Sequence, residues 1–382
     1  MKIAVVVNSI EFSKAGGVGS FVFELCKAFL TDKQEILIIG IIGSPNSWND
    51  SMVQELQRLG AKIECLELEN AKTALLECIP CAVKIRKILK RFSGGDNIIC
   101  NVHLKLSVLI GTIAGIGIPY IKVVETYHSQ YSRYWLQSKV LSLFIDYVIC
   151  CSESAFKEYL YRFKRRKGVC AIANGIDMKR LRNNISSFQN AQKERMLFCS
   201  VGRLSRQKGL ETTICAMNTM NNEKINYVIV GDGEEKKNLV QKITNKNIYL
   251  MGSLPRNEAL KIVRDSDMVL MPSLWEGLSI FQLEAMALGK PMMLSDIAAF
   301  RQVFNERPLD PNEEFRVCQW GYLISTNNPV AWEGAISHFI ANRDLKSKMG
   351  DAMLKISSCY DISRTARGYL DVFKYMLEEK RI

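Results

Sequence analysis

The chain has 382 residues, of which 48% are hydrophobic and 24% are charged. This length predicts two or three domains of about 150 residues each, and the hydrophobic fraction excludes an intrinsically disordered protein. No apolar run reaches the roughly 18 residues that a membrane-spanning helix needs, so the sequence predicts no transmembrane segment.

The net charge of +12 is concentrated in the first half of the chain. Residues 1–190 hold 25 Lys and Arg against 16 Asp and Glu, and residues 84–91 and 162–167 form two basic runs. Such a surplus can face nucleic acid, anionic lipid or an anionic substrate. Nucleic acid is disfavoured, because the basic runs lack interleaved aromatic residues and match no known nucleic-acid-binding module.

The twelve cysteines are scattered through apolar segments, which is typical of reduced thiols buried in a cytosolic protein. Cys78 and Cys81 have the spacing of a redox pair, but no second pair completes a zinc site, and we interpret the spacing as chance. We therefore expect a cytoplasmic protein. Peripheral attachment at the inner face of the membrane is an open alternative.

Short apolar runs alternate with amphipathic stretches from the N-terminus onwards. Because the runs are almost wholly apolar, they are typical of strands in a sheet that is covered on both faces. The alternation of strand and helix predicts a parallel, doubly wound α/β sheet. The expected strands are 3–8, 35–42, 62–66, 97–101, 121–125 and 147–151, and the expected helices are 18–30, 48–59, 76–92, 105–116 and 153–163.

A polar stretch at residues 178–195 interrupts this alternation and predicts an interdomain linker. The alternation then restarts, so we predict a second domain of the same class, with residues 1–185 as the first domain and 196–360 as the second. Its expected strands are 196–202, 226–230, 248–251, 268–271 and 291–294, and its expected helices are 208–220, 234–244, 256–264 and 280–288, followed by tail helices near 330–341, 343–356 and 362–379.

Doubly wound sheets bind ligands at the carboxyl ends of their strands. If the two Rossmann-like domains face each other, these ends form one central cleft, where a substrate site is expected. Gly16-Gly17-Val18-Gly19 lies between the first strand and the first helix of the chain. Glycines there let backbone amides approach an anion, although a tight turn would need the same residues.

Cations follow the first strand of the second domain. Arg203 and Lys208 stand beside the start of a helix, where they can bind a diphosphate, whereas Arg206 is expected in solvent. Farther along, Glu276 precedes a helix and Glu284 lies within it. Carboxylates at this spacing can hold the hydroxyl groups of a sugar and a ribose, although a capping residue and an ordinary helix glutamate would look the same.

The segment 272–291 is similar to the E-x7-E signature of retaining glycosyltransferases of family 4, which have the GT-B fold. The match extends from the Pro-Ser before Glu276 to the Glu-Ala-Met-Ala-x-Gly-Lys-Pro that begins at Glu284. Other family motifs match in order over nearly the whole chain: Gly16-Gly17-Val18-Gly19, Thr126-Tyr127-His128, Cys151-Ser152-Glu153-Ser154, Asn174-Gly175-Ile176-Asp177, Arg203 with Lys208-Gly209, and Gly231-Asp232-Gly233.

The resemblance implies a role for each matching residue. Arg203 and Lys208 would bind the donor diphosphate and neutralise the departing nucleoside diphosphate, Glu284 would hold the ribose, and Glu276 would contact the transferred sugar. It also implies that helix 362–379 packs back on the first domain. The remaining donor contacts would come from Gly16 and Gly17 of the opposite domain, from Ser253 and Leu254 near the base, and from Leu278, Ser279 and Ile280 near the sugar or phosphate.

The chain has three histidines, of which His128 resembles the family histidine near the sugar and the acceptor. His103 ends another predicted strand and is a secondary candidate, and His338 is expected at the surface of a tail helix. Asp265-Ser266-Asp267 looks like a metal-binding DxD motif, but it precedes its strand, away from the expected ligand edge. Arg203 and Lys208 can act in place of a metal, so we expect no metal and no other cofactor.

We predict transfer of a sugar from a nucleotide-diphosphate sugar to an acceptor hydroxyl group with retention of configuration. A UDP-sugar is favoured over GDP-mannose, and a lipid-linked or surface-polysaccharide saccharide is the expected acceptor. The resemblance implies front-face substitution. A nucleotide-sugar epimerase, a glycogen-type synthase and a non-catalytic nucleotide-sugar binder remain as alternatives, and an anionic membrane surface is a candidate partner of the basic first half.

Overall fold

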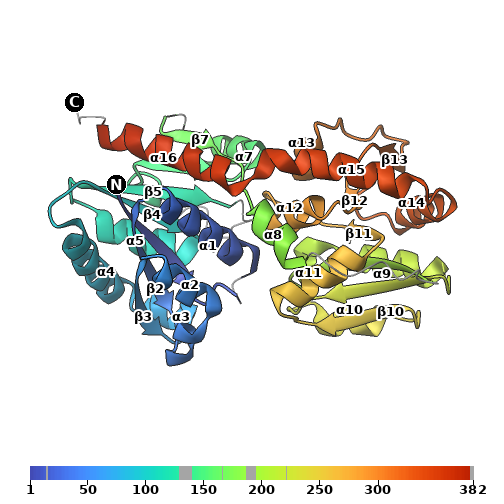
Figure 1. The fold of residues 1–382 in the computed structure, drawn as a ribbon, viewed down its shortest axis with the longest axis horizontal. Helices are drawn as coiled ribbons and strands as arrows, with labels where there is room; N and C mark the ends of the chain where they lie inside the picture. Colours follow the sequence, from blue (N-terminus) through green and yellow to red (C-terminus); the bar gives the residue numbers. More distant parts are fainter. Residues whose placement is uncertain (14–15, 129–139, 166, 186–194, 221, 379–382) are drawn as a thin grey trace. The chain divides into compact units, whose positions relative to one another are not determined.

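The computed structural model describes the chain except residues 14–15, 129–139, 166, 186–194, 221 and 379–382 (Figure 1). The chain forms two compact units, of which the first comprises Met1–Gly175 with Ile362–Ile382 and the second comprises Ile176–Asp361. Each unit contains one seven-stranded sheet with helices packed against it. The predicted α/β class with two Rossmann-like domains is confirmed.

The sheet of the first unit has the strand order β3-β2-β1-β4-β5-β6-β7, and all of its strand pairs are parallel. Strands β2 and β3 lie on one side of β1, and β4 to β7 lie on its other side, so the strand order reverses between β1 and β4. Doubly wound sheets bind ligands at such a point. The strands are β1 Lys2–Ser9, β2 Glu35–Ile42, β3 Lys62–Leu68, β4 Ile98–His103, β5 Ile121–Tyr127, β6 Tyr147–Cys150 and β7 Val169–Ala171.

Helices connect these strands, as the order of a parallel sheet requires. The expected helix at 76–92 is divided, because Glu77 separates two shorter helices. The described helices of the first unit are α1 Gly16–Thr31, η1 Pro45–Asn49, α2 Ser51–Arg58, α3 Ala71–Leu76, α4 Cys78–Ser93, α5 Lys105–Gly115, α7 Glu153–Phe163 and α16 Ile362–Glu378.

Helix α16 comes from the end of the chain but packs on α1, and Figure 1 shows it in red beside the early elements. Its buried residues recur at helical spacing, and Tyr369 and Phe373 place their rings 6.3 and 6.0 Å from that of Phe29. Thr365 Oγ1 donates a hydrogen bond of 2.8 Å to the carbonyl oxygen of Ala173. Apolar burial and this hydrogen bond hold the helix on the first sheet.

The sheet of the second unit has the order β10-β9-β8-β11-β12-β14-β13. Its last strand, β13, is antiparallel to β14, and this edge hairpin was not predicted. The strands are β8 Met196–Val201, β9 Ile225–Val230, β10 Ile248–Gly252, β11 Met268–Met271, β12 Met292–Ser295, β13 Phe315–Cys318 and β14 Gly321–Ile324.

The predicted linker at 178–195 is wrong over its first part. Residues 178–185 form helix α8, which packs on α11 and α12 and therefore belongs to the second unit rather than the first. Residues 186–194 of the predicted linker lie outside the described residues. The helices of this unit are α8 Met178–Ile185, η2 Arg206–Lys208, α9 Leu210–Met220, α10 Lys236–Lys242, α11 Arg256–Asp265, α12 Ile280–Ala287, α13 Ala298–Phe304, α14 Pro329–Ala341, α15 Leu345–Ser357 and η3 Ser358–Tyr360.

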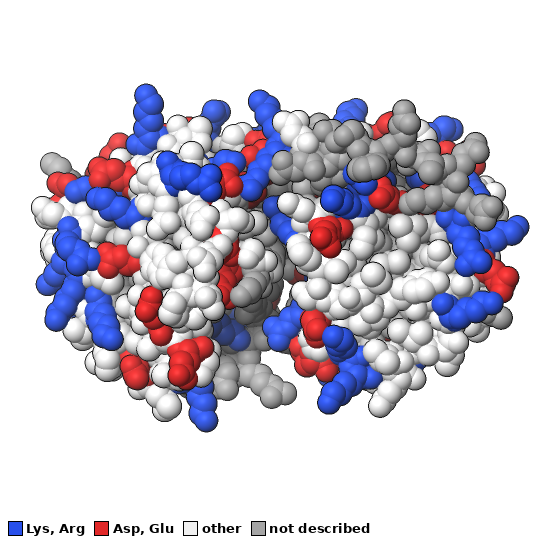
Figure 2. Space-filling view, turned by 60° about the horizontal axis from the view of Figure 1, so that its bottom comes forward, with Lys and Arg blue, Asp and Glu red and all other residues white. Residues whose placement is uncertain are grey.

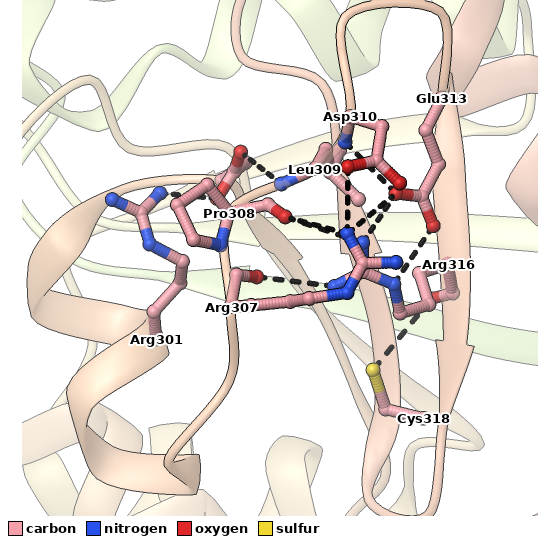
Figure 3. A network of polar contacts seen from close by, with 9 residues as sticks. Arg301, Arg307, Pro308, Leu309, Asp310, Glu313, Arg316 and Cys318 are labelled. Carbon is pink, nitrogen blue, oxygen red and sulfur yellow. Dashed lines mark hydrogen bonds and ion pairs between the residues drawn. The ribbon is translucent and has the colours of Figure 1, made fainter.

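The segment between α13 and β13 is held by Arg316 (Figure 3). Its guanidinium donates to both carboxylate oxygens of Glu313 and to the carbonyl oxygens of Arg307 and Pro308. A planar guanidinium can serve several acceptors at once, so this side chain fixes a loop that has no secondary structure of its own. The network stabilises the edge of the sheet, where β13 is the last strand.

All twelve cysteines are free thiols, as predicted. Burial raises the pKa of the Cys26, Cys100 and Cys199 thiols to about 12, so these side chains are protonated and behave as small apolar groups. In the described part of the chain, no helix is both long and apolar enough to span a membrane.

Candidate functional site

The loops that follow β8 and β11 are held together at the switch point of the second sheet. Gly209 has a φ of +58°, and a Cβ atom there would lie 2.1 Å from the carbonyl oxygen of Pro272, so only glycine fits. The amide of Leu274 donates a 2.8 Å hydrogen bond to the carbonyl oxygen of Gln207. A small pocket opens between the two strand ends, with Gly202, Lys208, Met271, Pro272 and Ser273 in its lining.

Lys208 and Glu276 meet beside this pocket. Lys208 Nζ lies 2.6 Å from Glu276 Oε1, and both side chains are largely buried, with 19% and 7% of their surfaces exposed. Ser273 Oγ also donates to Oε1 at 2.9 Å, and Gln207 Nε2 donates to Oε2 at 3.3 Å. The carboxylate is therefore fixed by three side-chain donors, and its Oε2 atom keeps capacity for a further donor.

Glu284 forms a second carboxylate–cation pair, about one turn into α12. Arg256, at the start of α11, donates to Glu284 Oε1 from Nε at 2.8 Å and from Nη2 at 2.5 Å. Only 9% of the Glu284 side chain is exposed. Among the described residues no hydrogen bond is recorded to Oε2, so that atom can accept one from a ligand hydroxyl.

Arg203 lies on the loop after β8 with a different environment. Its side chain is 74% exposed and forms an ion pair of 3.2 Å with Glu234, which is also exposed. An exposed pair of this kind contributes little to stability, so Arg203 is free to change partners. Arg206 is exposed, as predicted.

The other predicted donor contacts also lie at strand ends of the second sheet. Ser253 and Leu254 follow β10, with Ser253 exposed and Leu254 half-buried. Leu278, Ser279 and Ile280 are buried at the start of α12, where Ser279 Oγ accepts a 3.4 Å hydrogen bond from the amide of Gln282. The predicted positions of this unit therefore gather around the ends of β8, β10 and β11.

The first unit contributes a second group of predicted residues. Gly16 and Gly17 are exposed in the first turn of α1, and the φ of +66° at Gly16 favours glycine. His128 directly follows β5, and its ring lies 5.7 Å from that of Phe21 on α1. Burial lowers the pKa of His128 to about 4, so the imidazole is neutral at pH 7.

His103 lies beside His128 rather than apart from it. The Nδ1 atom of His103 is 3.2 Å from Nε2 of His128, and the two rings are stacked with centroids 5.5 Å apart. Burial, together with a smaller effect of His128, holds the pKa of His103 well below its usual value. The secondary candidate and the main candidate therefore form one neutral pair.

Two further predictions concern residues away from the strand ends. His338 was expected at the surface but is half-buried: its Nδ1 atom lies 2.9 Å from the Tyr322 hydroxyl, and its ring packs on Phe315. Asp267, in the DxD-like motif, pairs with Lys346 and accepts a 2.8 Å hydrogen bond from the amide of Leu197. That carboxylate has a structural role at the amino end of β11.

Comparison with known families agrees with this geometry. A family model described as "Glycosyl transferases group 1" matches residues 182–355, and one described as "Glycosyltransferase Family 4" matches residues 15–180. Together the two models span most of both units. The chain belongs to glycosyltransferase family 4.

Relatives of this family 4 glycosyltransferase include two proteins of Escherichia coli. The O-antigen biosynthesis glycosyltransferase WclY is 25% identical over 274 residues, which are 64% of this chain and 74% of WclY. A UDP-Gal:alpha-D-GlcNAc-diphosphoundecaprenol alpha-1,3-galactosyltransferase is 32% identical over 227 residues, which are 56% of this chain and 55% of that protein. Both relatives are glycosyltransferases, in agreement with the family models.

The fold also matches that of Anabaena HepE, a structure solved in complex with UDP and glucose. The TM-score is 0.77 at 16% identity, and the match covers 98% of this chain and all of the HepE chain. At this identity the likeness shows the fold, which is the GT-B fold of the predicted family.

Three polar residues of the candidate site were not singled out from the sequence. Arg256 holds Glu284, and Gln207 and Ser273 hold Glu276. Gln207 and Ser273 are adjacent to the predicted Lys208 and to the β11 end, so their positions offered a signal. Arg256 offered none, because it comes from a helix that lies 28 residues before its partner in the chain.

Proposed function

We propose that this protein transfers a sugar from a UDP-sugar to a hydroxyl group of a saccharide acceptor, with retention of the anomeric configuration and without a metal. The observation that carries the proposal is the buried Lys208–Glu276 pair at the end of β8 and β11. It puts a cation and a carboxylate side by side where doubly wound sheets bind nucleotides.

The two charges suit different parts of a nucleotide sugar. The ammonium group of Lys208 has three donors, of which one is used on Glu276, so the others can bind diphosphate oxygens. Arg203 supplies a second, mobile cation from the same loop. Glu276 and Glu284 retain acceptor capacity for sugar and ribose hydroxyl groups.

The proposed step is a front-face substitution. The bond between the anomeric carbon and the diphosphate oxygen breaks, and its electron pair stays on that oxygen. The acceptor oxygen bonds to the same face of the anomeric carbon, and its proton passes to the departing diphosphate. Lys208 and Arg203 stabilise the negative charge that develops there, which is the largest electrostatic demand of the reaction.

A nucleotide-sugar panel tests this proposal. The thermal midpoint of the wild-type protein is measured with UDP-, GDP- and ADP-sugars, since a bound donor raises the midpoint with occupancy. We expect the largest shift with a UDP-sugar, transfer of its sugar to a saccharide acceptor without added metal, and an α product by NMR from an α donor. A larger shift with GDP-mannose would replace the UDP assignment, and an inverted product would refute retention. Release of an isomerised donor without any acceptor would indicate an epimerase instead.

We further propose that the acceptor is lipid-linked and that helices α3 and α4 dock on an anionic membrane surface. Leu75, Leu76, Ile79 and Val83 are exposed at helical spacing, and 80% of Leu76 and 62% of Ile79 is accessible. Lys84, Lys87, Lys90 and Arg91 follow on α4 and are exposed as well. Basic side chains gather at the left edge of Figure 2, the side on which α4 lies in Figure 1.

An apolar stripe beside lysines is the pattern of a helix that lies in the membrane interface. We expect the double variant Leu76→Asp with Ile79→Asp to bind vesicles of anionic lipid about tenfold more weakly than wild type. Val330→Asp is the matched control, because Val330 is 65% exposed in the second unit. Equal binding to neutral and anionic vesicles, or unchanged binding of the double variant, would refute membrane docking.

A further inference from the structure

A chain of buried polar groups leads away from His128 in the first unit. His128 Nε2 lies 3.2 Å from His103 Nδ1, and His103 Nε2 lies 2.8 Å from Asn101 Oδ1. Asn101 Nδ2 donates to the carbonyl oxygen of Val124 and to Thr126 Oγ1, both at 3.0 Å. Asn101 and His103 lie on β4 and are at most 1% exposed.

The backbone determines which way the Asn101 amide points. The Val124 carbonyl carries no hydrogen, so the group that faces it must be the NH2 group of Asn101. The carbonyl oxygen Oδ1 therefore faces His103. Since Oδ1 can only accept, Nε2 of His103 must carry the hydrogen of this bond.

The tautomer of His103 determines that of His128. A neutral histidine has one N–H group, so His103 with hydrogen on Nε2 presents a lone pair at Nδ1. The Nε2 atom of His128 must then donate to it, which leaves Nδ1 of His128 as an acceptor. No hydrogen bond to that Nδ1 atom is recorded within the described residues.

We propose that Asn101 and His103 are positioning residues that hold His128 as its Nε2–H tautomer, so that Nδ1 accepts a hydrogen bond from a hydroxyl group of the sugar donor or the acceptor. This inference rests on the proposed function, because it takes His128 as a substrate contact. It also specifies that the substrate group bound at His128 Nδ1 is a hydroxyl group.

The neutral His128 binds a different kind of ligand group from the cations of the second unit. A neutral ring with a free lone pair recognises a donor such as a hydroxyl group, whereas a diphosphate oxygen is an acceptor and would meet no hydrogen at Nδ1. The row of hydrogen-bonded side chains that starts at His128 ends at the Asn101 amide, which does not take up a proton. Asn101 and His103 therefore orient His128 and do not carry a proton away from it.

The tautomers can be read directly by NMR. Long-range ¹H–¹⁵N correlation distinguishes Nδ1–H from Nε2–H histidine, and the chain has only three histidines to assign. We expect the Nε2–H form for both His103 and His128 in the wild-type protein, and a mixture of forms at His128 in His103→Leu. An Nδ1–H form of His128 in wild type, or an unchanged single form in His103→Leu, would overturn the proposal.

A matched pair of variants tests the consequence for turnover. His103→Leu and His103→Asn have side chains of similar size, but only asparagine offers a carbonyl oxygen that can accept from His128 Nε2. We expect His103→Leu to lower kcat/KM about tenfold, as for one misplaced hydrogen bond, and His103→Asn to restore it to within about threefold of wild type. Equal losses in both variants would show a merely structural role.

The dissociation constant of UDP separates this inference from the proposed function. It is expected to stay within about twofold of wild type in both variants, because neither His103 nor His128 is among the proposed nucleotide contacts. If wild type transferred no sugar from any nucleotide sugar, the proposed function would fail, while the NMR result would still decide the tautomer.

Discussion

The candidate residues of the second unit are charged and paired, whereas those of the first unit are neutral and joined in a hydrogen-bonded chain. Lys208 and Glu276 lie on loops after β8 and β11, and each largely buried charge is compensated by the other. His128 and His103 lie at the ends of β5 and β4, where burial disfavours the imidazolium form of each.

The two units therefore differ in the charge of the side chains that they offer to a ligand. Under the proposed function, the departing diphosphate gains negative charge, and the cations on the loops of the second unit would stabilise it. The neutral His128 of the first unit would instead accept a hydrogen bond from a hydroxyl group without adding a charge there. Three experiments test this contrast between charged and neutral residues, and the first has the largest expected effect.

The largest effect is expected from breaking the charged pair. Lys208→Met and Glu276→Gln should each lower sugar transfer by about a thousandfold, because one removes a diphosphate cation and the other a sugar contact. Each should also destabilise the protein by about 2 kcal/mol, since a largely buried charge is left without its partner. Steady-state transfer assays and urea unfolding measure both effects.

The double variant, Lys208→Met with Glu276→Gln, should recover part of the lost stability but none of the activity. Lys246→Met is the control, because it breaks an ion pair with Glu223 in which both side chains are mostly exposed. Near-normal turnover in both single variants would contradict the assignment of this pair.

A smaller effect should separate function from stability at Arg203. Its exposed ion pair with Glu234 predicts that Arg203→Ala changes the free energy of unfolding by less than about 0.5 kcal/mol. Loss of a diphosphate cation should nevertheless lower kcat/KM about a hundredfold. Arg206→Ala, which alters an exposed arginine of the same loop, should leave both quantities unchanged. Equal kinetics for the two variants would show that Arg203 has no part in catalysis.

The smallest expected effect is the pH dependence of stability that arises from the neutral His128. An unfolded histidine titrates near pH 6.5, whereas folded His128 stays neutral down to about pH 4. Between these values the unfolded state binds the extra proton, so stability falls as the pH drops from about 6.5 towards 4 and is fully present above that range. His128 alone should contribute a loss of about 2 kcal/mol between pH 7.5 and pH 5.

Urea unfolding at the two pH values is compared between wild type and His128→Gln, which should lose less stability, because only the share of His103 remains. His338→Gln is the control, because that histidine belongs to the second unit and should leave the loss in place. An equal pH dependence in wild type and His128→Gln would show that the His128 ring is not buried as a neutral group.

Much of the architecture followed from local pattern. Apolar runs without alternation predicted parallel strands, and the six expected strands of the first half all lie within or near β1 to β6. The hairpin of β13 and β14 was missed because Arg316 interrupts the apolar run of β13, in which no residue is fully buried. Helix α8 was taken as a linker because its residues are mostly polar, and packing on α11 and α12 decides its structure.

By itself, the sequence determined the α/β alternation, the family motifs and the residue types at the strand ends, because these depend on neighbours close in the chain. Only the tertiary structure decided which of those residues meet. Arg256 reaches Glu284 across 28 residues, and Asn101 and His103 set the state of His128 across a strand pair. Pairing and burial determine charge and tautomer, and both arise only when distant segments pack together.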